Sequence, residues 1–370
     1  MKEKIVIIGA NDFQNQLILK AKSLGYETHV FAWKDGAIGE KTADYFYPIS
    51  IVEKEEILEK CKEIKPVGIC SIASDLATIT VNYVAENLGL ICNPTSTTIQ
   101  CTNKFEMRKK MKENGVKTPV FIKVNNEKST WNVENMQFPV IVKPTDRSGS
   151  RGITKVFKKE ELEKAIKYAT KDSFEKMAII EEYIEGNEYS CECISYKGKH
   201  HFLAFTKKYT TGSPNFIETG HTEPSDIKEE YQEQIKENIF KALTALGIEN
   251  GASHTEFKID ENGKFGIIEI GARMGGDCIG SDLVQISTGY DFIKMVIDVA
   301  CGKEPDFTKV TKPRKAVIKF IFTQEDLNEM KKFKKNNEKK IYRISDMEIE
   351  NLGKTTDSSS RIGYYIYTED

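Results

Sequence analysis

The stretch Ala252–Gly276, ASHTEFKIDENGKFGIIEIGARMGG, decides the fold of this chain. Two runs of strand-forming residues, His254–Asp260 and Phe265–Gly271, flank the turn sequence ENGK. An asparagine–glycine turn between two such runs is typical of a β-hairpin. The stretch therefore predicts two antiparallel strands that meet at a tight turn.

Symmetric closure of that turn would place two glutamates directly opposite each other. The predicted pairs are Asp260 with Phe265, Lys258 with Ile267, Phe257 with Ile268, Thr255 with Ile270 and Glu256 with Glu269. Like charges that face each other across strands are destabilising, so the last pair requires a cation. Carboxylate oxygens favour a hard ion such as Mg²⁺, which commonly arrives with substrate phosphates. The alternative is a surface hairpin whose glutamates splay into water.

The composition is that of an ordinary globular protein. A chain of 370 residues with 39% hydrophobic and 30% charged residues predicts two or three domains. The formal net charge of −2 gives no sign of a nucleic-acid or anionic-membrane binder. We expect neither a membrane span nor a signal peptide, because the apolar runs are short and the N-terminus enters a strand pattern at once. The eight cysteines lack CxxC spacing, which favours reduced thiols in a cytoplasmic protein.

The first hundred residues alternate strand and helix patterns, which predicts a parallel α/β sheet. The first turn, GANDFQ, lacks the second and third glycines of the dinucleotide fingerprint. We therefore expect a Rossmann-like domain without a dinucleotide site. Polar residues follow the predicted strands at Asn11, Asp12, Ser74 and Asp75. They are either ligand-binding residues at the sheet edge or, as we favour, helix caps.

A different pattern begins at Cys101. A helix is followed by the strand FPVIVKP, which ends in Lys143 and Pro144 and leads into the sequence TDRSGSRG at 145–152. A loop rich in glycine and serine offers backbone N–H groups that could fold over phosphate. It is not a Walker A loop, and an ordinary surface turn is the alternative.

Several motifs follow one another in an order that resembles the ATP-grasp superfamily. They are Lys104 at a helix start, Lys143 before the SGSRG loop, the segment IIEEYIEGNEYS at 179–190, and Glu256 and Glu269 thirteen residues apart. The resemblance covers roughly residues 100–300. It implies a mixed α/β chain with the ATP-grasp fold and four parts. These are a Rossmann-like domain (1–103), a small lid subdomain (104–187), a large catalytic subdomain (188–303) and a C-terminal α/β appendage (304–370).

The resemblance implies a nucleotide site between the two halves. Lys104 and Lys143 would neutralise the triphosphate as flexible point charges. Residues 147–152 would close over the β- and γ-phosphates, and the loop residues assigned to the nucleotide are Ser148, Gly149, Ser150 and Gly152.

The segment at 179–190 resembles the hinge of the family and would hold the adenosine. Glu181 would accept from the adenine amino group, while the backbone of Tyr183 and Ile184 would read the edge of the ring. Glu188 would hold the ribose hydroxyls.

The acidic hairpin would hold the metal in this family. Glu256 and Glu269 would bind one or two Mg²⁺ ions that bridge phosphate oxygens, and Mn²⁺ could substitute. The family often has an asparagine two residues after the second glutamate as a further ligand. That residue is Gly271 here, so a second ion would be held more loosely or through water.

The run IEIGARMGG and the segment FIETGHTEP at 216–224 resemble the branch of carboxylate–amine ligases that join amino acids. Arg273 would grip a substrate carboxylate or the acyl-phosphate with its planar fork. Glu218 and His221 would face the amine-bearing substrate, and either could accept the amine proton. The alternative for His221 is a loop histidine with its hydrogen bonds satisfied.

The resulting hypothesis is an ATP-dependent ligase that forms an amide through an acyl-phosphate and releases ADP and phosphate. Its partners would be a small carboxylate and an amine, with no nucleic acid and no membrane. The alternatives are a bicarbonate-activating enzyme of the same fold, of the carboxylase or carbamoyl-phosphate type, and a nucleotide-binding protein without catalysis. The sequence leaves the oligomeric state open, with a homodimer as one candidate.

Overall fold

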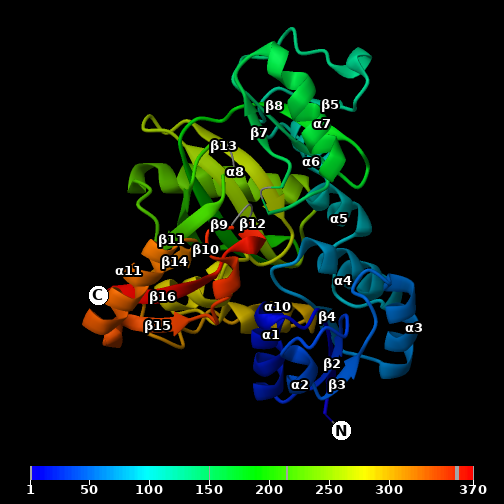
Figure 1. Ribbon diagram of the computed structural model, residues 1–370. Coiled ribbons are helices and arrows are strands. Elements are labelled where there is room, and N and C mark those ends of the chain that lie inside the picture. The colour runs from blue at the N-terminus through cyan, green and yellow to red at the C-terminus, as the bar shows by residue number, and fades with distance from the viewer. Residues whose placement is uncertain (1, 150, 214–215, 355–357, 370) are drawn as a thin grey trace.

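The computed structural model describes residues 2–149, 151–213, 216–354 and 358–369, which form three β-sheets (Figure 1). The N-terminal sheet is parallel, as the sequence predicts, and its strands have the order β3-β2-β1-β4. Its strands are β1 (Lys4–Ile8), β2 (Glu27–Phe31), β3 (Tyr45–Tyr47) and β4 (Gly68–Cys70). The helices of this part are α1 (Asp12–Ser23), α2 (Gly39–Thr42), α3 (Lys54–Ile64) and α4 (Asp75–Leu88).

A second four-stranded sheet, which is antiparallel, forms the part predicted to be the lid and is shown in green at the top of Figure 1. It has the order β5-β8-β6-β7, with β5 (Phe121–Val124), β6 (Val140–Pro144), β7 (Thr154–Val156) and β8 (Ala178–Glu182). Helix α7 (Leu162–Asp172) packs on this sheet through Leu162, Ala165, Ile166 and Ala169. Helices α5 (Thr95–Thr102) and α6 (Lys104–Glu113) connect the N-terminal part to the lid.

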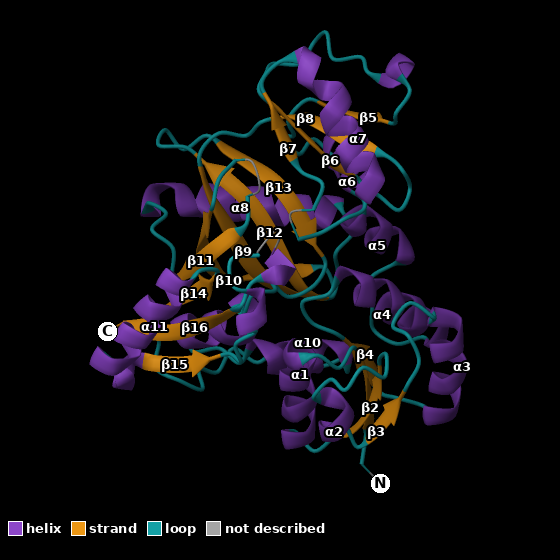
Figure 2. Cartoon of the chain, in the orientation of Figure 1, coloured by secondary structure: helices purple, strands orange, loops and turns teal. Residues whose placement is uncertain are grey.

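The third sheet has eight antiparallel strands in the order β13-β12-β9-β10-β11-β14-β16-β15 (Figure 2). The strands are β9 (Asn187–Tyr196), β10 (Lys199–Thr210), β11 (Glu218–Glu223), β12 (Gly251–Ile259), β13 (Phe265–Gly271), β14 (Lys315–Ile321), β15 (Ile341–Ile344) and β16 (Gly363–Glu369). Its longer helices are α8 (Glu229–Ala245), α9 (Val284–Thr288), α10 (Phe292–Ala300) and α11 (Gln324–Asn336). The C-terminal strands thus extend the same sheet, and the four-domain division stays a prediction.

Short helical turns complete the secondary structure. They are η1 (Lys128–Thr130), η2 (Lys159–Glu161), the π-helical turn η3 (Ile279–Leu283), η4 (Glu338–Lys340), η5 (Ile349–Asn351) and η6 (Ser358–Ser360). Within the described ranges, no helix combines the length and the apolar character that a membrane crossing requires.

The N-terminal part and the large sheet share one hydrophobic core, whereas the lid has its own. Helix α10 lies between the two sheets, and its Phe292 is fully buried. The same cluster contains Leu17 and Val30 from the N-terminal part and Ile194 from β9. The buried members of the lid cluster all come from residues 124–180. The lid sheet therefore packs around a hydrophobic cluster that is separate from the shared core.

The acidic hairpin forms, but its register near the turn differs from the prediction. Glu256 pairs with Glu269 and Thr255 with Ile270, as predicted. The pairs predicted for Asp260, Lys258 and Phe257 are wrong, because the observed pairs are Ile259 with Phe265, Lys258 with Gly266 and Phe257 with Ile267. The loop takes five residues rather than four, since the Asp260 side chain accepts from the N–H groups of Asn262 and Lys264. A β-bulge at Ile268 then restores the register.

Glu223, the last residue of β11, is a fully buried carboxyl group that lies where the large sheet meets α9. Ser287 of α9 donates to its Oε1 at 2.6 Å, and Thr206 of β10 donates to its Oε2 at 2.5 Å. Burial raises the pKa of Glu223 to about 8, although both hydroxyls oppose that shift. The group is therefore protonated in the folded protein at neutral pH.

We predict that this group makes the protein less stable as the pH rises. An unfolded glutamate has a pKa of about 4.3, so between that value and about 8 the folded state binds more protons. The free energy of unfolding should fall by on the order of 3 kcal/mol between pH 5 and pH 8 through this group. Urea unfolding of Glu223→Gln should show that slope removed, while the exposed control Glu261→Gln keeps it. Equal slopes in both variants would contradict the assignment.

A second prediction concerns Gly186, which leads into β9. It has φ +114°, and a Cβ there would stand 2.7 Å from the Asp260 nitrogen and closer still to the Ile259 carbonyl. Gly198 also has a positive φ, of +77°, but a Cβ there would meet nothing within 4 Å. Both alanine variants carry backbone strain. The difference between their losses in unfolding free energy therefore isolates the effect of the clash. We expect Gly186→Ala to lose roughly 1–3 kcal/mol more than Gly198→Ala in urea unfolding, and equal losses would exclude the clash.

Candidate active site

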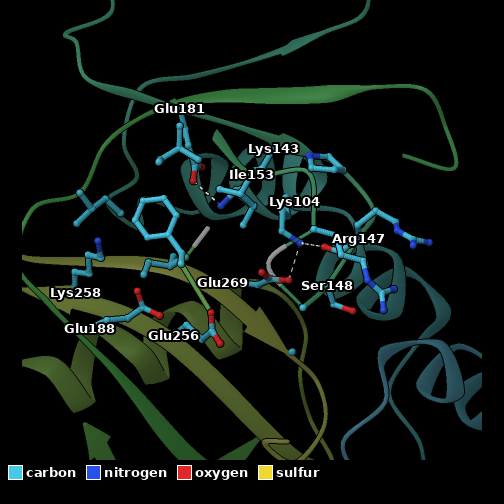
Figure 3. A pocket seen from close by; sticks show the side chains of 18 of the residues that line it. Lys104, Lys143, Arg147, Ser148, Ile153, Glu181, Glu188, Glu256, Lys258 and Glu269 are labelled. Carbon is cyan, nitrogen blue, oxygen red and sulfur yellow. Dashed lines mark hydrogen bonds and ion pairs between the residues drawn. The ribbon is translucent and has the colours of Figure 1, made fainter. Parts of the chain in front are cut away.

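A cavity lies between the lid and the large sheet (Figure 3). Twelve of the predicted site residues line it: Lys104, Lys143, Ser148, Gly149, Glu181, Tyr183, Ile184, Glu188, Glu218, Glu256, Glu269 and Arg273. Gly152 and His221 are outside the lining, and Ser150 lies outside the described residues. The lid thus supplies Lys143, Glu181 and the loop of the site, α6 supplies Lys104, and the large sheet supplies Glu188, Glu218, Glu256 and Glu269.

Glu181 in β8 is held by two cations in the wall of the cavity. Lys143 Nζ lies 2.6 Å from its Oε1, and Arg108 Nε lies 2.9 Å from its Oε2. Burial alone would raise the pKa of Glu181, but the two charges hold it at about 2. Burial lowers the pKa of Lys143, and Glu181 counteracts that shift. The carboxylate predicted to bind adenine therefore also fixes the lysine predicted to bind phosphate.

Arg108 is a functional residue that the sequence analysis missed. It lies on α6, one turn after Lys104, and its side chain is only 1% exposed. Besides Glu181, it donates through Nη2 to the carbonyl oxygen of Ile268 at 2.9 Å. Ile268 is the bulged residue of β13, so the bulge aims a carbonyl at the arginine. The spacing of four residues from Lys104, which puts both on one helix face, was the available signal.

Each glutamate of the acidic hairpin is matched by its own lysine. Lys104 Nζ lies 2.9 Å from Glu269 Oε1 (Figure 3). Lys208 Nζ, on β10, lies 2.5 Å from Glu256 Oε1. Among the described residues, no cluster of three or more His, Cys, Asp or Glu side chains could hold a metal ion. The carboxylates of Glu256 and Glu269 are hard oxygen donors of the kind that Mg²⁺ prefers.

Lys208 is a second residue that the sequence analysis missed. Its ammonium is also 3.5 Å from Glu188 and 3.7 Å from Glu218, and its side chain is 3% exposed. Burial opposes its charge, but the three carboxylates raise the pKa of Lys208 above its ordinary value. A lone lysine in a strand carries no sequence signal of this role, because its partners come from three other strands.

Gly271 leaves room for an ion pair between the large sheet and the N-terminal part. Arg273 donates to Asp75 through Nε at 2.8 Å and through Nη2 at 3.2 Å. A Cβ at Gly271 would stand 3.2 Å from Arg273 Cζ and 3.4 Å from Asp75 Oδ1. The space that an asparagine would need at this position is therefore taken by the Arg273–Asp75 pair.

The contacts of the polar residues at the edge of the N-terminal sheet show which of them are helix caps. Asn11 and Ser74 are helix caps, because their side chains accept from the first N–H groups of α1 and α4. Asp75 is not a cap, since both of its carboxylate oxygens bind Arg273. The capping interpretation is thus confirmed for Asn11 and Ser74 and wrong for Asp75.

His254, which also lines the cavity, was likewise missed. Its Nε2 is 3.4 Å from Glu256 Oε1, and its Nδ1 is hydrogen-bonded to Glu192. Burial opposes its protonation, but the charge of Glu192 raises the pKa of His254 to about 9. His254 precedes Glu256 by two residues and so lies on the same face of β12. That spacing was visible in the sequence.

The residues predicted to face an amine lie on β11, at one end of the cavity. Glu218 lines the cavity, whereas His221 is buried next to Asp277, with 3.6 Å between Nε2 and Oδ2. Neither ring nitrogen of His221 has a hydrogen-bond partner among the described residues, and burial lowers its pKa. Arg361, from the C-terminal segment, binds the Asp277 carboxylate. The interpretation of His221 as a satisfied loop histidine therefore finds no support.

Comparisons with known proteins bear on the family and the fold of the chain. Residues 136–282 match the ATP-grasp domain family. The alanine–anticapsin ligase of Bacillus subtilis is 29% identical over 316 residues, which are 75% of this chain and 65% of that ligase. The chain thus spans slightly less than two thirds of that relative. The D-alanine–D-alanine ligase of Clostridium beijerinckii is 27% identical over 68% of this chain and 85% of that ligase.

A solved structure extends the similarity to the whole chain. The L-amino acid ligase from Bacillus licheniformis superposes with a TM-score of 0.83 at 25% sequence identity. The match covers 100% of this chain and 93% of that structure. Residues 136–282 therefore match an ATP-grasp domain, and the chain has the fold of that L-amino acid ligase structure.

Proposed function

We propose that the protein is an ATP-dependent carboxylate–amine ligase that forms an amide through an acyl-phosphate. The observation that carries the proposal is the cavity whose lining brings Lys104, Lys143 and Arg273 together with Glu256 and Glu269. Within it, Lys104 pairs with Glu269 at 2.9 Å. The proteins named as ligases at 25–29% identity support the reaction type. We further propose a cytoplasmic enzyme whose partners are small carboxylates and amines, in keeping with its eight free thiols.

The charges of the cavity suit Mg·ATP. Lys104, Lys143 and Lys208 would bind phosphate oxygens, and Glu256 and Glu269 would hold the metal. In this structure Lys104 and Lys208 pair with the two glutamates. A divalent ion on the carboxylates would release both ammonium groups toward the phosphates. Bound Mg²⁺ would supply neutralisation of the charge that develops on phosphoryl transfer.

The rest of the nucleotide would lie along the hinge and under the lid loop. We assign the adenine to Glu181 and to the backbone of Tyr183 and Ile184, and the ribose to Glu188. Lys258 of β12 donates to the Tyr183 hydroxyl at 2.8 Å and so steadies that side of the pocket. The loop residues assigned to the phosphates remain Ser148, Gly149, Ser150 and Gly152.

Arg273 would orient the acyl-group donor. Asp75 engages Nε and Nη2 of the guanidinium, whereas Nη1 makes only a 3.4 Å contact with the Met274 carbonyl. That nitrogen can turn to a substrate carboxylate while Asp75 fixes the plane of the fork. The carboxylate oxygen attacks the γ-phosphorus in line, the bond to the ADP oxygen breaks, and Lys143 stabilises the charge on the transferring group.

The second step joins the amine to the activated carbon. The amine nitrogen forms a bond to the acyl carbon, phosphate leaves, and the ammonium proton passes to a base. His221, although it lies outside the cavity lining, is one candidate base, because burial lowers its pKa and its ring nitrogens lack hydrogen-bond partners among the described residues. Glu218 is the alternative base within the cavity lining. Lid closure would keep water from the acyl-phosphate.

A screen of ADP release with pairwise mixtures of amino acids and small carboxylates tests the proposal. We expect release that requires both a carboxylate and an amine, with one amide formed per ADP. Release that depends on bicarbonate alone would instead favour the carboxylating alternative. Tight ATP binding without turnover across the panel would favour the nucleotide-binding protein without catalysis.

We predict that Glu269→Gln loses ADP release by about 100-fold or more, because the amide cannot supply the charge that the metal requires. Circular dichroism should show an intact fold, since Lys104 still donates to the amide oxygen. Glu261→Gln, an exposed residue in the turn of the same hairpin, is the matched control and should keep full activity. Full activity of Glu269→Gln would exclude the metal assignment.

A further inference from the structure

A chain of buried polar contacts leads from the acidic hairpin to the loop that carries Arg273. His254 Nε2 is 3.4 Å from Glu256 Oε1, and His254 Nδ1 is hydrogen-bonded to Glu192 Oε1. The other oxygen of Glu192 accepts from the backbone N–H of Gly275 at 2.9 Å. Glu192 is 0% exposed and His254 is 5% exposed.

The backbone builds this chain from three segments. His254 and Glu192 are direct cross-strand partners in β12 and β9, so their side chains lie on one face of the sheet. Gly275 follows Arg273 by two residues. A Cβ on Gly275 would stand 2.8 Å from His254 Nδ1 and 2.7 Å from Glu192 Oε1. The first glycine of the ARMGG run therefore lets the loop backbone press against the buried pair.

The cost of burying these groups argues for a role beyond packing. A carboxylate taken fully out of water costs several kcal/mol unless it is paired, and apolar replacements of buried ion pairs are often as stable. Here both ends of the contact chain lie on the proposed machinery, with Glu256 at one end and the Arg273 loop at the other.

The contacts also orient Glu256. His254 Nε2 and Lys208 Nζ both reach the same oxygen, Oε1. Within the described part of the chain, the hydrogen bonds and ion pairs of this carboxylate all go to Oε1, which leaves Oε2 for a metal ion. Partners that orient a ligating side chain in this way commonly tune metal affinity.

We propose that His254 and Glu192 are positioning residues that fix the Glu256 carboxylate for the metal and tie it to the Arg273 loop. The proposal rests on the proposed function, because it presumes that Glu256 binds the metal of Mg·ATP. Neither residue touches substrate. Their effect is exerted on the orientation of Glu256 and on the position of the loop backbone at Gly275.

Metal binding measured without turnover tests the proposed positioning role of His254 and Glu192 separately from the reaction. The probe is Mn²⁺, titrated by electron paramagnetic resonance in the presence of a non-hydrolysable ATP analogue. We expect His254→Ala to weaken Mn²⁺ binding about 10- to 100-fold, while analogue binding measured in EDTA changes less than twofold. Added imidazole should restore part of the Mn²⁺ affinity of this variant, because the space it leaves opens on the cavity. A purely structural role would not respond to imidazole.

A matched control is His29, a buried histidine of β2. Its ring nitrogens contact the Tyr47 hydroxyl at 2.9 Å and Glu27 at 3.0 Å, remote from the cavity lining. His29→Ala should bind Mn²⁺ as the wild type does. If His254→Ala fails to fold, Glu192→Met, which keeps the volume and removes the carboxylate, should give the same loss. Wild-type Mn²⁺ affinity in folded His254→Ala or Glu192→Met would overturn the proposed positioning role of these residues. A wild-type protein that binds no Mn²⁺ with the analogue would overturn the ligase proposal itself, and the positioning role with it.

Discussion

The buried contact between Arg108 and Glu181 is the interaction on which the arrangement of the site depends. Arg108 comes from α6, Glu181 from the lid, and the Ile268 carbonyl that Arg108 also binds comes from the large sheet. One guanidinium thus joins three parts of the chain, and Glu181 passes the constraint on to Lys143. Removing one partner of a buried pair typically costs about 3–5 kcal/mol of stability. The Arg108 side chain therefore fixes the position of the lid relative to the large sheet.

Local patterns in the sequence predicted much of the fold, whereas the resemblance to the ATP-grasp superfamily predicted twelve of the residues that line the cavity. The strand–helix alternation predicts the parallel N-terminal sheet, and the motif order places Lys143, Glu256 and Glu269 around one cavity. The turn length was wrong because a side-chain contact by Asp260 decides it, and no residue pattern announced the compensating bulge at Ile268.

The residues that escaped prediction are those whose role arises only from tertiary contacts. Lys208 meets carboxylates from three other strands, and Asp75 meets Arg273 across a separation of 198 residues. A periodic pattern within one element cannot report such pairings. Arg108 and His254 were closer to detection, because each lies at a regular spacing from a residue that the motifs did identify.

The division of the hydrophobic cores has a consequence for traffic through the cavity. One wall is continuous with the core that α10 shares with the N-terminal part, whereas the lid buries its apolar residues among themselves. Arg108 forms a buried ion pair with Glu181 of the lid, and the buried members of the lid cluster all lie within residues 124–180. In the proposed enzyme, the large sheet would therefore be the fixed part of the cavity and the lid its moving part. In the proposed ligase, a product could leave only after the ion pairs that hold the lid had separated, so product release and lid opening would be one event.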